Sequence, residues 1–198
     1  MTPVGRQRIG IFGGTFDPPQ LGHLAAAKQV LTLLSLDKVL FLPAGDPWQK
    51  SDVSSAAERT KMVSLAISDE PLFELSTLEV DRSGPTYTVE TLTLLKEQFP
   101  DTDLFFILGD DAFEGITTWK SWEELGSLAT LVVITRHGNK VDVPEILLPS
   151  VNLLEVSALP ISSTQCRELV LNGGNLEGLV PPVVAKYISE HHLYRSNA

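Results

Sequence analysis

Residues 13–23 read GGTFDPPQLGH and follow directly on the apolar run RIGIF at residues 8–12. The run predicts a short buried strand, and the paired glycines after it let a ligand approach the bare backbone closely. Apolar residues then recur at helical spacing, which predicts an amphipathic helix over residues 22–35. His23 lies in its first turn, where the helix dipole favours an anion. The segment therefore predicts a phosphate-handling junction between a strand and a helix.

This segment differs from the two common phosphate loops. It contains no Gly-x-Gly-x-x-Gly and no Gly-Lys-Ser/Thr ending. A dinucleotide-binding dehydrogenase and a P-loop NTPase both lose their main support for this reason. If the two glycines are considered alone, the alternative is that they form an ordinary solvated loop with the prolines.

Apolar runs of strand length alternate with helical patterns along the chain. We expect further strands at residues 39–42, 104–108 and 131–134, and helices at residues 55–69, 88–98 and 163–171. Residues 138–152 have the most loop-like sequence. Such alternation predicts an α/β fold, a Rossmann-like, doubly wound and mainly parallel sheet with helices on both faces. Without a repeat or a long linker, residues 1–198 are expected to form a single domain.

Composition restricts the function. The 198 residues carry a formal net charge of −10, which argues against nucleic-acid binding but permits a mononucleotide held by a few cations. The single cysteine, Cys166, excludes an intrachain disulfide and a cysteine-built zinc site. With no apolar run of membrane-span length and no signal-peptide pattern, we expect a cytoplasmic protein without membrane contact. A homo-oligomer stays open.

Polar and glycine-rich segments follow four of the expected strands. They are Gly13-Gly14, residues 43–50 with Lys50, Gly109-Asp110-Asp111, and Arg136. Ligands bind at the carboxyl ends of strands in such sheets, so these segments are expected to converge on one cleft.

Residues 161–167 read ISSTQCR and place hydroxyl groups at the start of a helix, with Arg167 about one turn in. Ser162 or Ser163 is expected to act as an N-cap. The same arrangement offers N–H groups, hydroxyls and a guanidinium to a triphosphate.

Both segments resemble signatures of the nucleotidyltransferase α/β phosphodiesterase superfamily. Residues 13–23 resemble its Gly-Gly-Thr-Phe-Asp-Pro-x-His-x-Gly-His, and residues 161–167 resemble its Ile-Ser-Ser-Thr-x-x-Arg at every specified position. Along nearly the whole chain, the sequence is similar to the bacterial nicotinate mononucleotide adenylyltransferases of the actinobacterial type. One departure is Gln20, which stands where the family has its first histidine.

The resemblance implies a role for each matching residue. The catalytic residues it implies are His23, Arg167 and Gln20. The ATP-binding residues it implies are Gly13, Gly14, Thr15, Phe16, Gly109, Asp111, Ser162, Ser163 and Thr164. The acceptor-binding residues it implies are Lys50, Thr86, Tyr87, Thr88, Trp119 and Arg136, with no metal-ligating residue.

Trp119 illustrates the competing interpretation. Trp119 and Trp122 lie three residues apart and would share one helix face, so both are expected in the core by default. The resemblance instead makes Trp119 the platform that stacks on a pyridine ring. A lysine in a loop is usually solvated, but the resemblance places Lys50 over the substrate phosphates.

The implied reaction joins ATP and nicotinate mononucleotide to give deamido-NAD and pyrophosphate, with Mg²⁺ delivered with ATP. Two alternatives stay open. The acceptor could be nicotinamide mononucleotide or phosphopantetheine, or the chain could be a weakly active nucleotide-binding protein because of Gln20. If nothing compensates for Gln20, a histidine there should raise kcat about tenfold.

Overall fold

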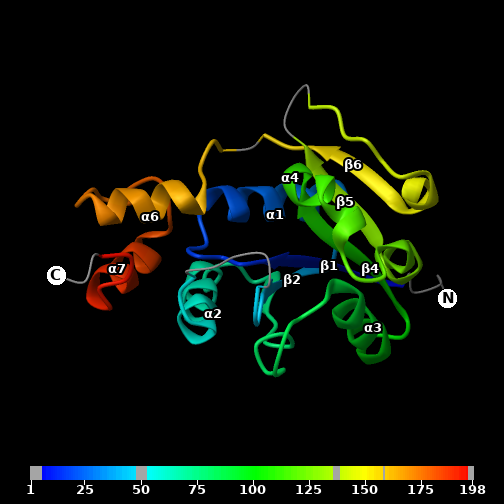
Figure 1. The fold of residues 1–198 in the computed structure, drawn as a ribbon, viewed down its shortest axis with the longest axis horizontal. Coiled ribbons are helices and arrows are strands. Elements are labelled where there is room, and N and C mark those ends of the chain that lie inside the picture. The colour runs from blue at the N-terminus through cyan, green and yellow to red at the C-terminus, as the bar shows by residue number, and fades with distance from the viewer. Residues whose placement is uncertain (1–5, 48–52, 136–138, 158, 196–198) are drawn as a thin grey trace.

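The computed structural model describes residues 6–47, 53–135, 139–157 and 159–195. Six strands form one sheet in the order β3-β2-β1-β4-β5-β6, and every neighbouring pair is parallel (Figure 1). The strands are β1 (Gln7–Gly14), β2 (Lys38–Pro43), β3 (Phe73–Leu75), β4 (Thr102–Gly109), β5 (Thr130–Thr135) and β6 (Val151–Glu155). This sheet confirms the predicted Rossmann-like α/β class.

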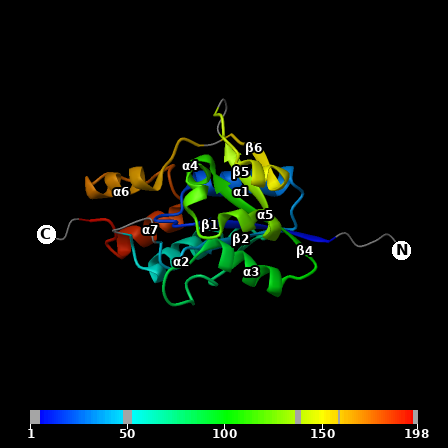
Figure 2. The same ribbon diagram turned by 45° about the vertical axis from the view of Figure 1, so that its right-hand side comes forward.

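Helices connect the strands and follow the last one. The α-helices are α1 (Leu21–Leu33), α2 (Ala56–Ala66), α3 (Thr88–Gln98), α4 (Asp110–Glu114), α5 (Leu125–Leu128), α6 (Ser163–Leu171) and α7 (Pro182–Glu190). Short 3-10 helices are η1 (Ile116–Thr118), η2 (Trp122–Glu124) and η3 (Glu145–Ser150). Figures 1 and 2 both place α6 and α7 together at the end of the molecule near the C-terminus, opposite the N-terminus.

The central strands β1, β2, β4 and β5 are buried on both faces, because successive side chains alternate between two apolar clusters. In β4, for example, Phe105 and Ile107 pack on one side with α1, α2, α6 and α7. Leu104 and Phe106 pack on the other side with α3, α4 and α5. The central strands therefore carry near-continuous apolar runs, which explains why the sequence reveals them.

The strand order reverses between β1 and β4. On one side of this point lie β2 and β3, and on the other side lie β5 and β6. This is the topological switch point, where open parallel sheets leave a crevice at the strand ends. β1 ends in Gly13-Gly14 and β4 ends in Gly109, so both edges of the crevice are bare backbone. The fold thus brings the predicted phosphate junction to the position where ligands bind.

Several elements differ from the expectations. α1 ends at Leu33 and α2 at Ala66, each before its predicted end. The loop-like stretch 138–152 contains η3 and the first residues of β6. β6 escapes detection because it is an edge strand with no fully buried residue and the mixed sequence VNLLE. β3, which has three residues, and α7 were not predicted. Among the described residues, no helix is long and apolar enough to cross a membrane.

Candidate active site

Two cavities adjoin at the switch point, and both are floored by the glycines that end β1 and β4. The larger, of about 850 Å³, is called the phosphate cavity here. It is lined by Phe12, Gly13, Gly14, Thr15, Phe16, Asp17, Gln20, Gly22, His23, Gly109, Asp111, Ile161, Ser162, Ser163, Thr164 and Arg167, among others. The smaller, of about 380 Å³, is called the aromatic cavity. Its lining includes Gly13, Gly14, Thr15, Glu79, Thr86, Tyr87, Thr88, Phe106, Gly109, Asp111, Trp119 and Lys120.

Gln20 is the N-cap of α1, and its hydrogen bonds connect it to His23. Its side-chain Oε1 accepts from the His23 backbone N–H at 3.2 Å, and its backbone N–H donates to His23 Nδ1 at 3.1 Å. Its Nε2 donates to the carbonyl of Ile161 at 3.0 Å, on the way to α6. A Cβ at Gly22 would lie 2.4 Å from Gln20 Oε1, so a larger residue there would require the Gln20 side chain to shift. The Gln20 amide is therefore bonded to the protein in this structure.

The same contacts fix the ring of His23. Phe12 and Phe16 meet it edge to face, with ring centroids 6.0 and 5.2 Å away. Phe16 has φ +50°, and its ring lies so close to Gly14 that a Cβ there would approach it to 3.0 Å. Because Nδ1 accepts the Gln20 N–H, the ring carries its proton on Nε2 in this arrangement. His23 thus lines the phosphate cavity with its ring held at Nδ1 by the Gln20 backbone.

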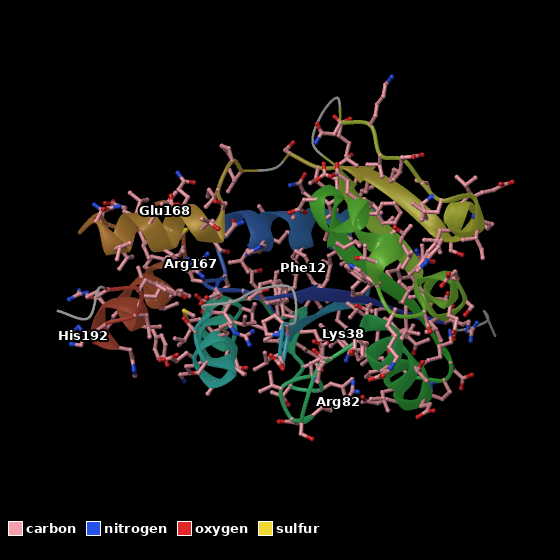
Figure 3. The ribbon with its side chains drawn as sticks, viewed as in Figure 1. Phe12, Lys38, Arg82, Arg167, Glu168 and His192 are labelled. Atoms are coloured by element: carbon pink, nitrogen blue, oxygen red, sulfur yellow. The ribbon has the colours of Figure 1, made fainter. Side chains whose placement is uncertain are left out.

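The start of α6 is tied to the loop between β1 and α1. Ser162 is the N-cap and accepts from the Gln165 backbone N–H at 3.1 Å, as expected. Ser163 Oγ donates to the Pro18 carbonyl at 2.8 Å. Arg167 Nη1 donates to the Asp17 carbonyl at 2.8 Å, and Figure 3 shows Arg167 on the side of α6 toward that loop. Two segments about 145 residues apart thus form one wall of the phosphate cavity.

Arg59 of α2 is a brace that the sequence analysis missed. It is 1% exposed and donates to three carbonyls, those of Thr15 at 3.0 Å, Gly45 at 3.1 Å and Ser54 at 3.0 Å. Burial lowers its pKa, while nearby Asp17 opposes the shift. A signal was available, because Arg59 shares the apolar face of α2 with Met62 and Val63. A cation on a buried face needs partners.

Aromatic and hydroxyl side chains dominate the second cavity. Trp119 meets Phe106 edge to face, with centroids 6.3 Å apart, and lies opposite the segment Thr86–Thr88. Trp119 follows η1 in an extended conformation and Trp122 begins η2, so the two do not share a helix face as the sequence suggested. Only Trp119 of the two lines the aromatic cavity.

Two ionisable groups of this cavity were also missed. Burial raises the pKa of Glu79, although hydrogen bonds from Thr91, Thr86 and the Gly45 backbone oppose it. The Thr91 hydroxyl donates to Glu79 Oε1 at 2.8 Å. Lys120 Nζ donates to Glu90 Oε1 at 2.7 Å and lies 4.5 Å from the centre of the Tyr87 ring. Both groups already have protein partners, which shape the wall of the cavity.

Most predicted site residues therefore meet as expected. All twelve residues assigned to catalysis or ATP line the phosphate cavity, and Thr86, Tyr87, Thr88 and Trp119 line the aromatic one. Lys50 and Arg136 lie outside the described residues. His191 and His192 are both exposed, and the His191 ring stacks on Tyr187.

The comparisons with known proteins agree with this geometry. Residues 11–169 match the model of the cytidylyltransferase-like family, and the chain belongs to that family of nucleotidyltransferases. Its relatives include a probable nicotinate-nucleotide adenylyltransferase of Leifsonia xyli, 48% identical over 100% of this chain and 99% of the relative. One of Streptomyces coelicolor is 48% identical over 92% of this chain and 98% of the relative. The family that the two signatures predicted is thereby confirmed.

A solved structure shares the whole architecture. It is the nicotinic acid mononucleotide adenylyltransferase of Plasmodium falciparum complexed with NaAD. Its TM-score to this chain is 0.81 at 25% sequence identity, covering 95% of this chain and 97% of that one. The similarity therefore extends over nearly the whole fold of this chain.

Proposed function

We propose that this chain transfers the adenylyl group of ATP to nicotinate mononucleotide, giving deamido-NAD and pyrophosphate in NAD biosynthesis. The observation that carries the proposal is the pair of adjoining cavities over Gly13, Gly14 and Gly109. The polar cavity suits a triphosphate, and the aromatic one suits a pyridine ring. The names of the relatives support the same reaction.

The chemistry needs little covalent help from the protein. An oxygen of the acceptor's 5′-phosphate attacks the α-phosphorus of ATP in line, and the bond from that phosphorus to the bridging oxygen breaks. Pyrophosphate leaves with the bond's electron pair. Catalysis of such a step consists mainly of alignment and charge stabilisation. The glycine floor lets both substrates approach the backbone, so their reacting atoms can meet there.

Each polar group then has a role in the phosphate cavity. His23 donates from Nε2 to the reacting phosphates, and Gln20 holds the ring in that orientation through the cap. Arg167, Ser162, Ser163 and Thr164 hold the leaving pyrophosphate at the start of α6, where the helix dipole favours an anion. Gly109 and Asp111 hold the adenosine by backbone and carboxylate.

Mg²⁺ enters with ATP in this proposal, ligated by phosphate oxygens and water, and neutralises phosphate charge. The described residues contain no group of three or more histidine, cysteine, aspartate or glutamate side chains placed to hold a metal. The Asp17 carboxylate lies in the cavity wall, and its two oxygens already accept hydrogen bonds from the Tyr194 hydroxyl and the Ser54 backbone N–H. The donor set of the protein therefore suits an ion that the triphosphate carries.

The aromatic cavity would recognise the acceptor by ring and by charge. Trp119 offers a flat face to the pyridine ring. Thr88 is the first residue of α3. The N-cap residue Tyr87 makes no side-chain hydrogen bond to the first turn, so the N–H groups of that turn lack a capping acceptor. A helix N-terminus favours a carboxylate over a neutral amide. This arrangement favours nicotinate mononucleotide over nicotinamide mononucleotide as the acceptor. We also propose that the reaction takes place in the cytoplasm.

A pyrophosphate-release assay with ATP and each acceptor tests the proposal. Nicotinate mononucleotide should give pyrophosphate and a product with the mass of deamido-NAD. Phosphopantetheine should give neither. Pyrophosphate release with phosphopantetheine alone would move the chain to another branch of the family. No release with any acceptor would favour a nucleotide-binding protein, the alternative that Gln20 raises.

A further inference from the structure

We propose that Tyr194 is a positioning residue that orients His23 through Asp17. The inference rests on the proposed function, because it assigns a part in that reaction to the far end of the chain. Tyr194 Oη donates to Asp17 Oδ1 at 2.6 Å, across 177 residues of sequence. It is the shortest of the contacts that hold the loop between β1 and α1.

Asp17 is the centre of the arrangement. It is 2% exposed, and each of its acceptor groups is engaged by a different part of the fold. Its Oδ1 accepts from Tyr194, its Oδ2 accepts from the Ser54 backbone N–H at 3.1 Å, and its carbonyl accepts from Arg167 at 2.8 Å. The carboxylate therefore ties the loop to Ser54 and Tyr194.

The chain is bent specifically to deliver the phenol. After α7, His192 has φ +52° and Tyr194 has φ +61°, both in the left-handed region that side chains disfavour. The Leu193 backbone N–H donates to the Ile188 carbonyl at 3.0 Å, which closes the turn. The phenol reaches the interior beside Met62, whose Sδ lies 3.8 Å from Oη. Backbone strain of this kind persists where surrounding contacts require it.

The loop held by Asp17 carries the groups that fix His23. Phe16 precedes Asp17, and its ring centroid lies 5.2 Å from that of His23. Gln20, three residues after Asp17, caps α1 by accepting a hydrogen bond from the His23 backbone N–H. A shift of Asp17 would therefore move the contacts that Phe16 and Gln20 make with the imidazole. Burial and the adjacent carboxylate raise the pKa of Tyr194, so the phenol stays a neutral donor and adds no charge to the phosphate cavity.

The test compares Tyr194→Phe with Tyr187→Phe in the full chain. Tyr187 belongs to the same C-terminal region, and its ring stacks on His191 away from Asp17. Tyr194→Phe should lower kcat about five- to tenfold, with KM for both substrates changed less than about twofold. Tyr187→Phe should leave kcat and KM unchanged. An unchanged kcat in Tyr194→Phe, or an equal loss in both variants, would overturn the proposal.

Two further measurements separate positioning from folding and from the proposed reaction. The ¹⁵N resonances of the His23 ring, recorded without substrate, should shift in Tyr194→Phe and stay in place in Tyr187→Phe. This readout holds even if the chain uses another acceptor. In a double-mutant cycle, Tyr194→Phe should cost kcat little in an Asp17→Asn background, because the partner is already weakened. Unmoved resonances or additive losses would contradict the route through Asp17.

Discussion

The two cavities of the crevice are built in opposite ways. The phosphate cavity is walled by loops that remote side chains brace, since Arg59, Ser163 and Arg167 all donate to loop carbonyls. The aromatic cavity is walled by ring faces, and its ion pairs lie toward solvent, with the Lys120 side chain 51% exposed. Bracing fixes charge-handling groups before the reaction, whereas an aromatic wall selects a ligand by shape. Substitutions on the two sides should therefore change different kinetic constants.

The largest effect is expected for Arg59→Met. The change leaves three carbonyls without their buried donor, each costly on its own. Urea denaturation should show a loss of about 3 kcal/mol or more in the free energy of unfolding. Lys61→Met, on the exposed side of the same helix, should change it by less than about 0.5 kcal/mol. Equal losses would mean that the brace adds nothing.

His23→Ala should be the most damaging change to turnover. The ring donates to phosphates most strongly in the transition state, so kcat should fall about 10²-fold or more. Binding of ATP, measured by calorimetry, should weaken much less. His191→Ala removes an exposed imidazole and serves as the control. Near-normal turnover of His23→Ala would show that this residue takes no part in the mechanism. The contrast drawn between the phosphate and aromatic cavities would then fail as well.

Trp119→Ala tests the other side. Loss of the stacking face should raise the acceptor KM about tenfold or more, since such a platform contributes about 1–3 kcal/mol. The KM for ATP should change less than about twofold. Trp122→Ala provides a matched control, because Trp122 packs in the same cluster without lining the cavity. If ATP and acceptor binding weakened together, Trp119 would be a core residue.

Variants of Gln20 separate charge from capping. Gln20→Ala removes the cap on α1 and the tie to Ile161, so kcat should fall about tenfold. Gln20→His restores a group that can carry charge but sacrifices part of that network. We therefore expect a gain of about threefold or less, below the tenfold expected from charge alone. A full tenfold gain in steady-state turnover would show that the network is incidental.

The smallest effect is expected for Glu90→Gln. Hydrogen bonds from Lys120 and Arg82 lower the pKa of Glu90, so these bonds contribute stability above its ordinary pKa. That contribution is lost as the pH falls through the lowered value. The variant should show a slightly lower Tm than the original chain at neutral pH, and the difference should vanish in acid or high salt. The acceptor KM should rise less than about threefold. A Tm difference that stays constant at every pH would show that the ion pairs of Glu90 do not cause it.

The parts of the fold that the sequence predicted are those buried on both faces. β1, β2, β4 and β5 carry continuous apolar runs because both sides of each strand are covered. The edge strands β3 and β6 lack that signal, as one is three residues long and the other half-exposed. The sequence also predicted the glycine floor and the start of α6, where local spacing itself creates the chemistry.

The partners of Arg59 and Tyr194 could not be found in the same way, although the place of Arg59 on the apolar face of α2 was a signal that it is buried. The Arg59–Thr15 bond spans 44 residues and the Tyr194–Asp17 bond spans 177, whereas Glu79 is bonded to Thr91 only 12 residues away. Only the folded chain brings these groups together. Gln20 is intermediate, because its capping bond to His23 is local but its bond to Ile161 spans 141 residues. Sequence patterns thus located most residues that face the crevice, with Glu79 and Lys120 as exceptions, whereas the long-range contacts that hold its walls required tertiary structure.

The central claim is that the aromatic cavity selects a nicotinate ring by its charge as well as its shape. The ratio of kcat/KM for nicotinate mononucleotide to that for nicotinamide mononucleotide tests it most directly, with ATP saturating. Donors at the start of α3 match a carboxylate and mismatch an amide, and such mismatches are costly when buried. We predict a ratio of at least about ten in favour of nicotinate. Equal values for the two acceptors would contradict the account.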